Sequence, residues 1–313
     1  MAEQFEVDVA AAGQRLDRFL AAATNQSRGA IRRAIESGSV WIDEARVRVQ
    51  ATPVVAGQRI TLHPTPLQAV RPRVVYEDDD LLILDKPAGL PTSPPPEGGS
   101  SALSFVHDHL ELRGKDRVGE VHRLDRDASG LLVFGKHREA VGKLGVAMQR
   151  RRINRGYVAW IHVARLPEPE RIEAPLRGRR GGGVEIHATG APAVTRMVPL
   201  CHDADAAVAC VALSLETGRM HQIRAHLAWA VGPILGDLRY GAPRSEGLDR
   251  IALHASRLAL RHPRTGQGMS FTAAIAESDL CDLPAQPSDP TGVLRELGRG
   301  PFESERALAA LNP

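Results

Sequence analysis

The chain has few cysteines, scattered histidines and no long apolar run. Its three cysteines, Cys201, Cys210 and Cys281, form no Cys-x-x-Cys pair, which argues against a disulfide framework and against a cysteine-based zinc site. The twelve histidines include no i, i+4 pair of the kind that helical metal sites use. No apolar run approaches the roughly 18 to 20 residues of a membrane helix, and the N-terminus lacks a basic-then-apolar signal pattern. These absences predict a cytoplasmic protein with no membrane segment and no metal site.

Lysine is also scarce, since only four of the 40 basic residues are lysines and the rest are arginines. A GC-rich genome would produce this bias, and so would a preference for arginine on phosphates and base faces. Composition does not separate the two explanations. The arrangement of the arginines along the chain is therefore the more informative property.

Residues 1–63 have the pattern of a small α/β module. Leu16, Phe19 and Leu20 share one face of a predicted helix, and a second helix is predicted to begin after Ser27, a residue type that caps helices. Strand patterns follow at residues 40–42 and 59–62.

Charge is segregated in this module. Its two predicted helices carry five arginines against two acids, Asp17 and Glu36. Such a face is either an ordinary solvated helix surface or a surface for a phosphate backbone, and segregation on a small module favours the second. The candidate RNA-binding residues of the module are Arg15, Arg18, Arg28, Arg32 and Arg33.

The rest of the chain divides into three parts. Residues 64–74 are punctuated by proline and predict a linker. Residues 75–276 combine short apolar runs with a helical stretch at 137–151, which predicts an α+β domain with flanking helices around a large, mainly antiparallel mixed sheet. Residues 277–313 are polar and proline-rich and predict a C-terminal extension that ends in a short amphipathic tail. The apolar runs lie at residues 81–84, 131–134, 157–161 and 207–213.

The stretch from Glu120 to Phe134 begins as a polar turn and then enters an apolar strand. Loops held by rigid strands are common positions for catalytic residues. Asp125 in this turn is a competent nucleophile if it is ionised, and a nearby cation favours the ionised form. A structural ion pair is the competing interpretation of Asp125, and Asp127 is the competing carboxylate.

The segment from Thr217 to Leu227 offers that cation. If a helix begins after Gly218, His221 and Arg224 lie at i, i+3 on one face and aim a guanidinium at the site. An apolar face of the same helix would consist of Met220, Ile223 and Leu227.

Tyr157 follows a basic run that begins at Arg150. A half-buried tyrosine at the start of a strand is the ordinary interpretation. Cations that lead into an aromatic residue also suit unstacked RNA, whose bases rest on rings while cations hold the phosphates.

Two motifs together resemble the RluA family of pseudouridine synthases. They are the His122–Asp125 tetrapeptide followed by Ser129–Gly130 and a strand, and the Gly218–Arg224 segment. The order of a helix, a Ser-Arg-x-x-Ile helix and a Gly-x-Val strand in residues 1–63 resembles the S-four-like RNA-binding domain.

The first resemblance implies the pseudouridine synthase fold and an RNA pseudouridine synthase that isomerises uridine without a cofactor. Asp125 would be the nucleophile, Arg224 its ion-pair partner, and Tyr157 the platform beneath the target base. Large-subunit ribosomal RNA is the favoured substrate and transfer RNA the second, and we expect a monomer. The resemblance assigns further RNA contacts to His122, Arg123, Arg155 and His221.

Weaker family matches at residues 85–91, 235–241 and 253–258 are interpreted as scaffold first and RNA contacts second. The chain departs from the family pattern at three places. Ala128 replaces a common threonine, Thr92-Ser93 replaces a frequent Val-His, and Met220 replaces a frequent threonine.

Two other classes of function stay open. One is a non-catalytic RNA-binding or ribosome-assembly protein that uses the basic N-terminal face. The other is a glycoside hydrolase, which needs two carboxylates that flank one bond. Asp125 and Asp127 would share one face of a strand-like segment, which does not suit that chemistry. Because Arg224 and Tyr157 single out Asp125, Asp127 is assigned a loop-stabilising or capping role.

Overall fold

The computed structural model describes two compact units, Met1–Arg71 and Pro72–Pro313. Within them, the described residues are 3–36, 39–43, 45–47, 49–62, 71–95, 100–111, 118–168, 170–179, 182–243, 248, 250–274, 280, 283–286 and 293–295. In this part of the chain, no helix combines the length and the apolar character needed to span a membrane.

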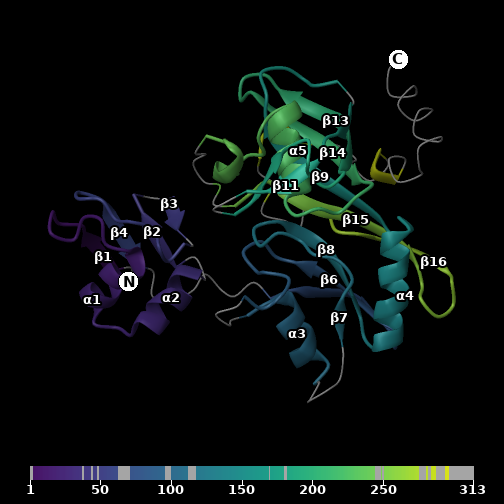
Figure 1. Ribbon diagram of the computed structural model, residues 1–313, viewed down its shortest axis with the longest axis horizontal. Helices are drawn as coiled ribbons and strands as arrows, with labels where there is room; N and C mark the ends of the chain where they lie inside the picture. The colour runs from purple at the N-terminus through teal and green to yellow at the C-terminus, as the bar shows by residue number, and fades with distance from the viewer. Residues whose placement is uncertain are drawn as a thin grey trace. The chain divides into compact units, whose positions relative to one another are not determined.

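The N-terminal unit is a four-stranded antiparallel sheet with two helices (Figure 1). Its strand order is β1-β4-β2-β3. The predicted helices and the two predicted strands are confirmed, whereas the short strands β1 and β3 were not predicted. Its elements are β1 (Glu3–Glu6), α1 (Leu16–Thr24), α2 (Arg28–Glu36), β2 (Val40–Ile42), β3 (Ala45–Val47) and β4 (Arg59–Leu62).

The core of this unit follows the helical pattern of the sequence. Leu16 and Leu20 of α1 and Ile31 and Ile35 of α2 are fully buried. The hydroxyl of Ser27 accepts a hydrogen bond from the amide of Ala30 at 3.2 Å, as expected of a cap at the start of α2.

The predicted linker reaches into the second unit, because strand β5 already begins at Arg73. The units divide between Arg71 and Pro72. Residues 64–70 of the predicted linker lie outside the described residues.

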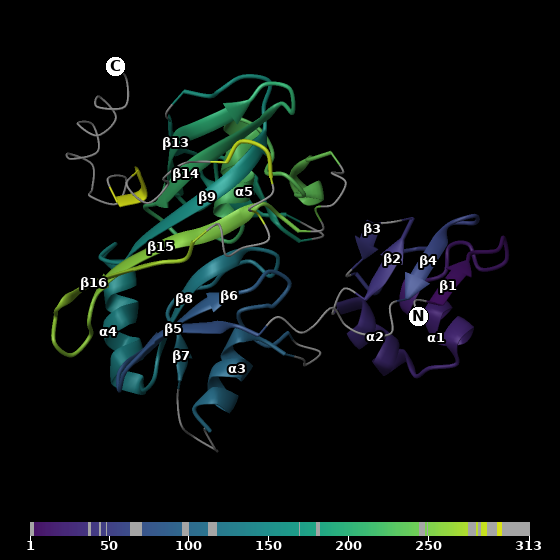
Figure 2. The same cartoon turned by 180° about the vertical axis from the view of Figure 1, so that it is seen from behind.

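The second unit contains a ten-stranded mixed sheet, which Figures 1 and 2 show from opposite sides. Eight strands follow the order β10-β13-β14-β9-β15-β8-β6-β5, while β16 pairs with β15 and β7 pairs with β8. Its described strand pairs are antiparallel except for β8 and β15, so the predicted mainly antiparallel sheet is confirmed. The strands are β5 (Arg73–Glu77), β6 (Leu81–Lys86), β7 (Gly119–Glu120), β8 (Ser129–Gly135), β9 (Asn154–His162), β10 (Glu170–Glu173), β13 (Val194–Asp203), β14 (Val208–Leu215), β15 (Leu253–Arg261) and β16 (Gly268–Thr272).

Helices cover both faces of this sheet, which explains why β6 and β8 are apolar without alternation. Successive side chains of a strand point to opposite faces. Leu82 and Leu84 belong to the same core cluster as residues of α3 and α5, whereas Leu81 and Ile83 cluster with Leu144 of α4. The helices are α3 (Ala102–His109), α4 (Arg138–Gln149), α5 (Gln222–Ala230) and the 3₁₀ turn η1 (Leu238–Tyr240).

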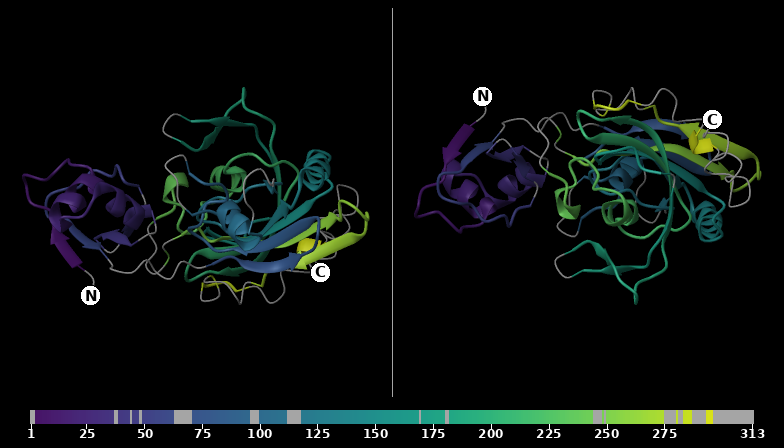
Figure 3. Two further views of the ribbon diagram at one scale, coloured as in Figure 1. Left: turned by 90° about the horizontal axis from the view of Figure 1, so that it is seen from below. Right: turned by 90° about the horizontal axis from the view of Figure 1, so that it is seen from above.

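A separate hairpin of β11 (Leu176–Gly178) and β12 (Val184–Ile186) projects from the sheet, as the teal-green hairpin in Figure 3 shows. Its strands pair with each other in a two-stranded sheet.

Part of the predicted C-terminal extension packs onto the large sheet. Leu280 and Leu294 are buried in the core that also holds α3 and α5. The carbonyl oxygen of Ala285 accepts hydrogen bonds from the indole of Trp160 and the thiol of Cys201. The predicted amphipathic tail at residues 303–311 lies outside the described residues.

Candidate active site

The loop between β7 and β8 presents Asp125. Residues 125–128 form a turn, in which the amide of Ala128 donates to the carbonyl of Asp125 at 3.2 Å. The polar turn predicted before the strand is therefore confirmed, whereas the expectation that Asp125 and Asp127 share one face of a strand-like segment is wrong, since β8 begins only at Ser129. Because Asp125 lies in a turn, the direction of its side chain is not set by the alternation of side chains along a strand.

Lys86 clamps this loop from β6. Its ammonium is fully buried and lies 2.8 Å from the carbonyls of Pro87 and Leu90, 3.1 Å from that of Arg126 and 2.7 Å from that of Ala128. Burial lowers the pKa of Lys86 to about 7, although the charge of nearby Asp127 opposes this change. The scaffold role expected for residues 85–91 agrees with these contacts.

Thr92 holds the other end of the loop. Its hydroxyl donates to the carbonyl of Leu124 at 2.9 Å and accepts from the amide of Leu124 at 3.0 Å. Thr92 is only 2% exposed. Leu124 directly precedes Asp125, so the threonine that departs from the family pattern fixes the backbone beside the candidate nucleophile.

Arg224 of α5 pairs with two carboxylates. Its Nη1 lies 3.0 Å from Oδ2 of Asp125, and its Nε and Nη2 lie 2.7 and 2.8 Å from the two oxygens of Asp237. Burial opposes the charge of Arg224, but the hydrogen bonds and the negative charge of Asp237, together with Asp125, raise its pKa above the usual value. The predicted pair of Asp125 and Arg224 is present, and Asp237 fixes the guanidinium from the opposite side.

The two carboxylates differ in exposure. The side chain of Asp237 is 1% exposed, whereas that of Asp125 is 24% exposed. Asp237 receives two hydrogen bonds from the guanidinium, which occupy both of its oxygens. Oδ1 of Asp125 accepts no hydrogen bond from the described residues. Asp125 is therefore the carboxylate that is open to a ligand.

Helix α5 begins later than the sequence predicts. It starts at Gln222, and His221 before it adopts a left-handed conformation with φ of 49°. The side-chain oxygen of Gln222 accepts hydrogen bonds from the hydroxyl of Thr217 and the amide of Arg219, which holds the preceding residues in a turn. As a result, Met220 is 56% exposed and its predicted place on a buried helix face is wrong. Ile223 and Leu227 are buried as predicted.

Tyr157 lies in β9 and is 4% exposed. Burial raises its pKa above the usual value, and the charge of Arg155 only partly offsets this effect. The phenol is therefore neutral at physiological pH. Arg155 is itself buried, and its Nη2 donates to the carbonyl of Thr217 at 3.4 Å.

A cavity of about 910 Å³ in the second unit brings these elements together. Asp125, Tyr157 and Arg155 line it, and so does Arg123, whose side chain is exposed. This is enough space for a nucleotide, since ligand pockets of roughly 300–1,000 Å³ hold molecules of that size. Its remaining lining residues include His122, Arg126, Arg151, Arg219, Met220 and His221.

The two histidines that were predicted to contact RNA, His122 and His221, both have lowered pKa values, which disfavours the protonated form that would pair with a phosphate. Burial, together with the charge of Arg155, lowers the pKa of His122 to about 3, and its Nε2 accepts from the amide of Val133 at 3.4 Å. His122 is therefore a neutral ring that supports β8. Burial also lowers the pKa of His221, whose Nδ1 lies 3.1 Å from the hydroxyl of Tyr240.

The ring of Tyr240 lies against Arg224, with the guanidinium carbon 5.0 Å from the ring centroid. Such a contact stabilises a cation. Tyr240 and Asp237 belong to the segment 235–241, which the sequence suggested as scaffold first and RNA contact second. Their part in the site depends on contacts across the fold that no local pattern reveals.

In the N-terminal unit, Asp17 forms hydrogen bonds with three of the five candidate RNA-binding arginines. Arg15, Arg28 and Arg32 each donate to its carboxylate. Arg18 is exposed, and the side chain of Arg33 lies outside the described residues.

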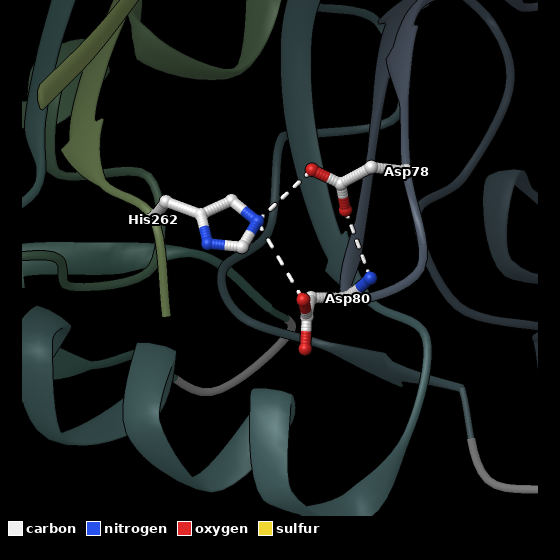
Figure 4. Close-up of side chains that lie close together, drawn as sticks. All are labelled: Asp78, Asp80 and His262. Atoms are coloured by element: carbon white, nitrogen blue, oxygen red, sulfur yellow. Dashed lines mark hydrogen bonds and ion pairs between the residues drawn. The ribbon is translucent and has the colours of Figure 1, made fainter. Parts of the chain in front are cut away.

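Asp78, Asp80 and His262 place three potential metal-ligand atoms within 4.8 Å of one another (Figure 4). These atoms already have protein partners. Asp78 accepts from the hydroxyl of Tyr76 and from His262, and Asp80 lies 2.8 Å from the guanidinium of Arg264. We interpret the cluster as a structural network that ties the β5–β6 turn to the end of β15.

Comparison with known proteins agrees with these features. A family described as RNA pseudouridylate synthase matches residues 80–229, and the S4 domain matches residues 14–60. Ribosomal large subunit pseudouridine synthase D of Vibrio parahaemolyticus is 32% identical over 85% of this chain and 88% of its own length. An RNA pseudouridine synthase of Chloroflexus aurantiacus is 39% identical over 91% of this chain and 90% of its own.

The structure of human RNA pseudouridylate synthase domain containing 1 shares the fold. Its TM-score is 0.59 at 22% identity, over 74% of this chain and 96% of the human one.

Proposed function

Because the chain belongs to the RNA pseudouridine synthase family, we propose that it converts uridines of large-subunit ribosomal RNA to pseudouridine with Asp125 as nucleophile. The observation that carries the proposal is the arrangement of Asp125, Arg224 and Asp237. It leaves one carboxylate open in a cavity that is large enough for a nucleotide. Relatives that are named ribosomal large subunit pseudouridine synthases D and C support the choice of RNA.

The target base has to leave its stack to reach Asp125, because the carboxylate lies inside the cavity. Flipping a nucleotide costs a few kcal/mol. Arg123, which is exposed on the cavity lining, would fill the vacated space or hold the backbone of the flipped nucleotide. Tyr157 would support the ring inside.

The reaction exchanges one bond of the base for another. Asp125 attacks the anomeric carbon or the uracil ring, or it assists loss of the base through a glycal. In each case the N1–C1′ bond breaks, the uracil rotates and a C5–C1′ bond forms. The hydrogen on carbon 5 leaves as a proton and N1 ends protonated, so no oxidant or reductant is consumed.

Arg224 stabilises the negative charge of Asp125 before the attack and when the carboxylate leaves. Its own position is fixed by the two hydrogen bonds to Asp237. Tyr157, whose pKa is raised by burial, offers a neutral hydroxyl beside the ring.

The decisive experiment is release of tritium from RNA labelled at carbon 5 of uridine. We expect Asp125→Asn to fold, bind RNA and release no tritium, and Asp127→Asn in the same loop to lose far less activity. Normal release by Asp125→Asn would refute the assignment. Release of free uracil would indicate a hydrolase, and a harmless Asp125→Asn with loss of function on deletion of residues 1–63 would indicate a non-catalytic RNA-binding protein.

The choice of RNA has its own test. Pseudouridines are mapped in ribosomal and transfer RNA from cells with and without the protein. We expect sites to disappear from large-subunit ribosomal RNA, and loss confined to transfer RNA would overturn that choice.

A further inference from the structure

A cluster of four charged side chains joins the two helices of the N-terminal unit. The carboxylate of Asp17 lies 3.0 Å from Nε of Arg15, 3.0 Å from Nη2 of Arg28 and 3.1 Å from Nε of Arg32. Asp17 is fully buried. These four residues are called the Asp17 cluster.

The cluster contains more positive charge than a buried carboxylate needs. One well-placed guanidinium, with backbone donors, is enough to compensate a buried acid. Here three arginines surround a single acid, which leaves a local charge of +2. The hydrogen bonds of Arg15, Arg28 and Arg32 hold the pKa of Asp17 well below its usual range although burial opposes this, so the charge of the cluster is constant at physiological pH.

The arginines remain open to solvent. Their side chains are 48%, 51% and 43% exposed for Arg15, Arg28 and Arg32. Each guanidinium has five N–H donors, and the contacts to Asp17 use only one or two of them. The remaining donors can reach a ligand that approaches from the solvent.

The buried carboxylate also restricts the three guanidiniums before any ligand arrives. A free arginine loses side-chain entropy when it binds a phosphate, and a guanidinium that is already held loses less. Donors with fixed positions and an excess of positive charge are the properties of a site for phosphate oxygens.

We propose that the Asp17 cluster is a preorganised receptor for backbone phosphates of the RNA, and that the negative charge of Asp17 is required for it. The inference rests on the proposed function, which supplies RNA as the substrate. It also distinguishes the N-terminal arginines from one another, since Arg18 lies on α1 beside Asp17 but is not a member of the cluster. Asp17 acts as a positioning residue, and the arginines make the contacts.

This proposal and simple electrostatics predict opposite results for Asp17→Asn. The substitution makes the protein one charge more positive, so attraction at long range alone would tighten binding to RNA. If Asp17 organises the arginines, the affinity falls instead, by about tenfold, as expected for loss of ordered charge-assisted contacts. The measurement is binding of the full chain to a transcript of large-subunit ribosomal RNA at several salt concentrations.

Arginine variants provide a matched comparison. Arg28→Gln, Arg32→Gln and Arg18→Gln each remove one positive charge. We expect each cluster variant to reduce the slope of log affinity against log salt by about 0.7 to 0.9, as for one lost phosphate contact, and Arg18→Gln to change it less. Thermal unfolding identifies any variant that has lost its fold. If Asp17→Asn does not fold, the salt dependence of RNA binding by the three arginine variants tests the proposal instead.

The proposal is overturned if folded Asp17→Asn binds RNA as tightly as the wild type, or if Arg18→Gln weakens binding as much as Arg28→Gln does. Tritium release by the wild type from the same transcript is scored separately. If the wild type releases no tritium, the proposed function is wrong. If it releases tritium normally but the cluster variants bind RNA like the wild type, only the proposed phosphate receptor is wrong.

Discussion

The two units of the protein use the same ionic chemistry with opposite stoichiometry. In the N-terminal unit one buried carboxylate, Asp17, holds three arginines that remain about half exposed. In the candidate active site one nearly buried arginine, Arg224, holds two carboxylates, of which only Asp125 is appreciably exposed. The charge that the others share is negative in the first case and positive in the second.

In both places one charge is shared by several charges of the opposite sign. Asp17 positions three exposed arginines, and Arg224, itself held by the buried Asp237, positions Asp125 in the cavity. What is presented to the ligand follows from this arrangement. The N-terminal unit presents donors, which suit phosphates, and the catalytic unit presents a carboxylate, which suits nucleophilic attack. Counting charges along the sequence shows neither arrangement, because burial decides which partner is left open.

The largest effect should follow from removal of the buried cation. Arg224→Gln removes the positive charge that pairs with Asp125 and Asp237, so we expect tritium release to fall by about 10²- to 10³-fold and the free energy of unfolding to fall by about 3–5 kcal/mol. Urea denaturation and single-turnover kinetics measure the two losses. Arg28→Gln is the matched substitution in the N-terminal unit, where two arginines stay on Asp17, and should cost less than about 1 kcal/mol. Equal losses of stability would remove the distinction between the clusters.

How much of this site the sequence predicts depends on the range of the contacts. Asp125 and Arg224 are 99 residues apart, and their pairing was predicted because two motifs resemble one family. Asp237 was assigned to the scaffold, since nothing in its local pattern distinguishes an acid that holds a guanidinium from one that caps a turn. The same holds for Thr92, whose hydroxyl meets Leu124 only in the folded chain.

The fold class was predictable because apolar runs and helical spacing are local properties. The start of α5 was not, since the side chain of Gln222 binds Thr217 and Arg219 and replaces the expected first turn of the helix. Strand β1 was missed for a similar reason. It is short, mostly exposed and defined by its pairing with β4 rather than by its own pattern.

Asp237→Asn tests whether the two buried carboxylates, Asp237 and Asp17, serve different steps. Asp237 touches Arg224 rather than the RNA, so its replacement should lower kcat by about 10- to 100-fold, as for loss of hydrogen bonds to a charged group, with little change in RNA affinity. Asp17→Asn should instead lower the RNA affinity with little change in kcat. RNA binding and single-turnover rates are measured on both variants. An Asp237→Asn protein with weakened binding and an unchanged rate would contradict the assignment of Asp237 to catalysis and of Asp17 to binding.

Thr92 tests whether the backbone beside Asp125 has to be held as firmly as its carboxylate. Thr92→Val keeps the shape but removes the hydroxyl, so the amide and carbonyl of Leu124 lose a buried partner. We expect kcat to fall by about three- to tenfold at unchanged RNA affinity, and Thr92→Ser to restore most of the rate. Equal rates for the valine and serine variants would show that the hydroxyl has no part in positioning Asp125.

The smallest effect concerns the network of Asp78, Asp80 and His262, which is also rich in charge but lies outside the cavity lining. Burial opposes ionisation of Asp78, but hydrogen bonds from Tyr76, from the amides of Leu81 and Asp80, and from His262 lower its pKa to about 2. A carboxylate whose pKa is lowered by folding stabilises the protein above its unfolded pKa, and that contribution disappears as the pH falls toward the folded value.

Asp78 should therefore contribute about 2 kcal/mol at pH 7, which is lost progressively between about pH 5 and pH 2. The difference in unfolding free energy between wild type and Asp78→Asn should shrink over that range in urea denaturation. Tritium release by folded Asp78→Asn at pH 7 should equal that of the wild type, because the network orders the β5–β6 turn and presents no charge to the RNA. A fall in the rate without a fall in stability would show that this network, like the Asp17 cluster and the Arg224 site, contributes to function.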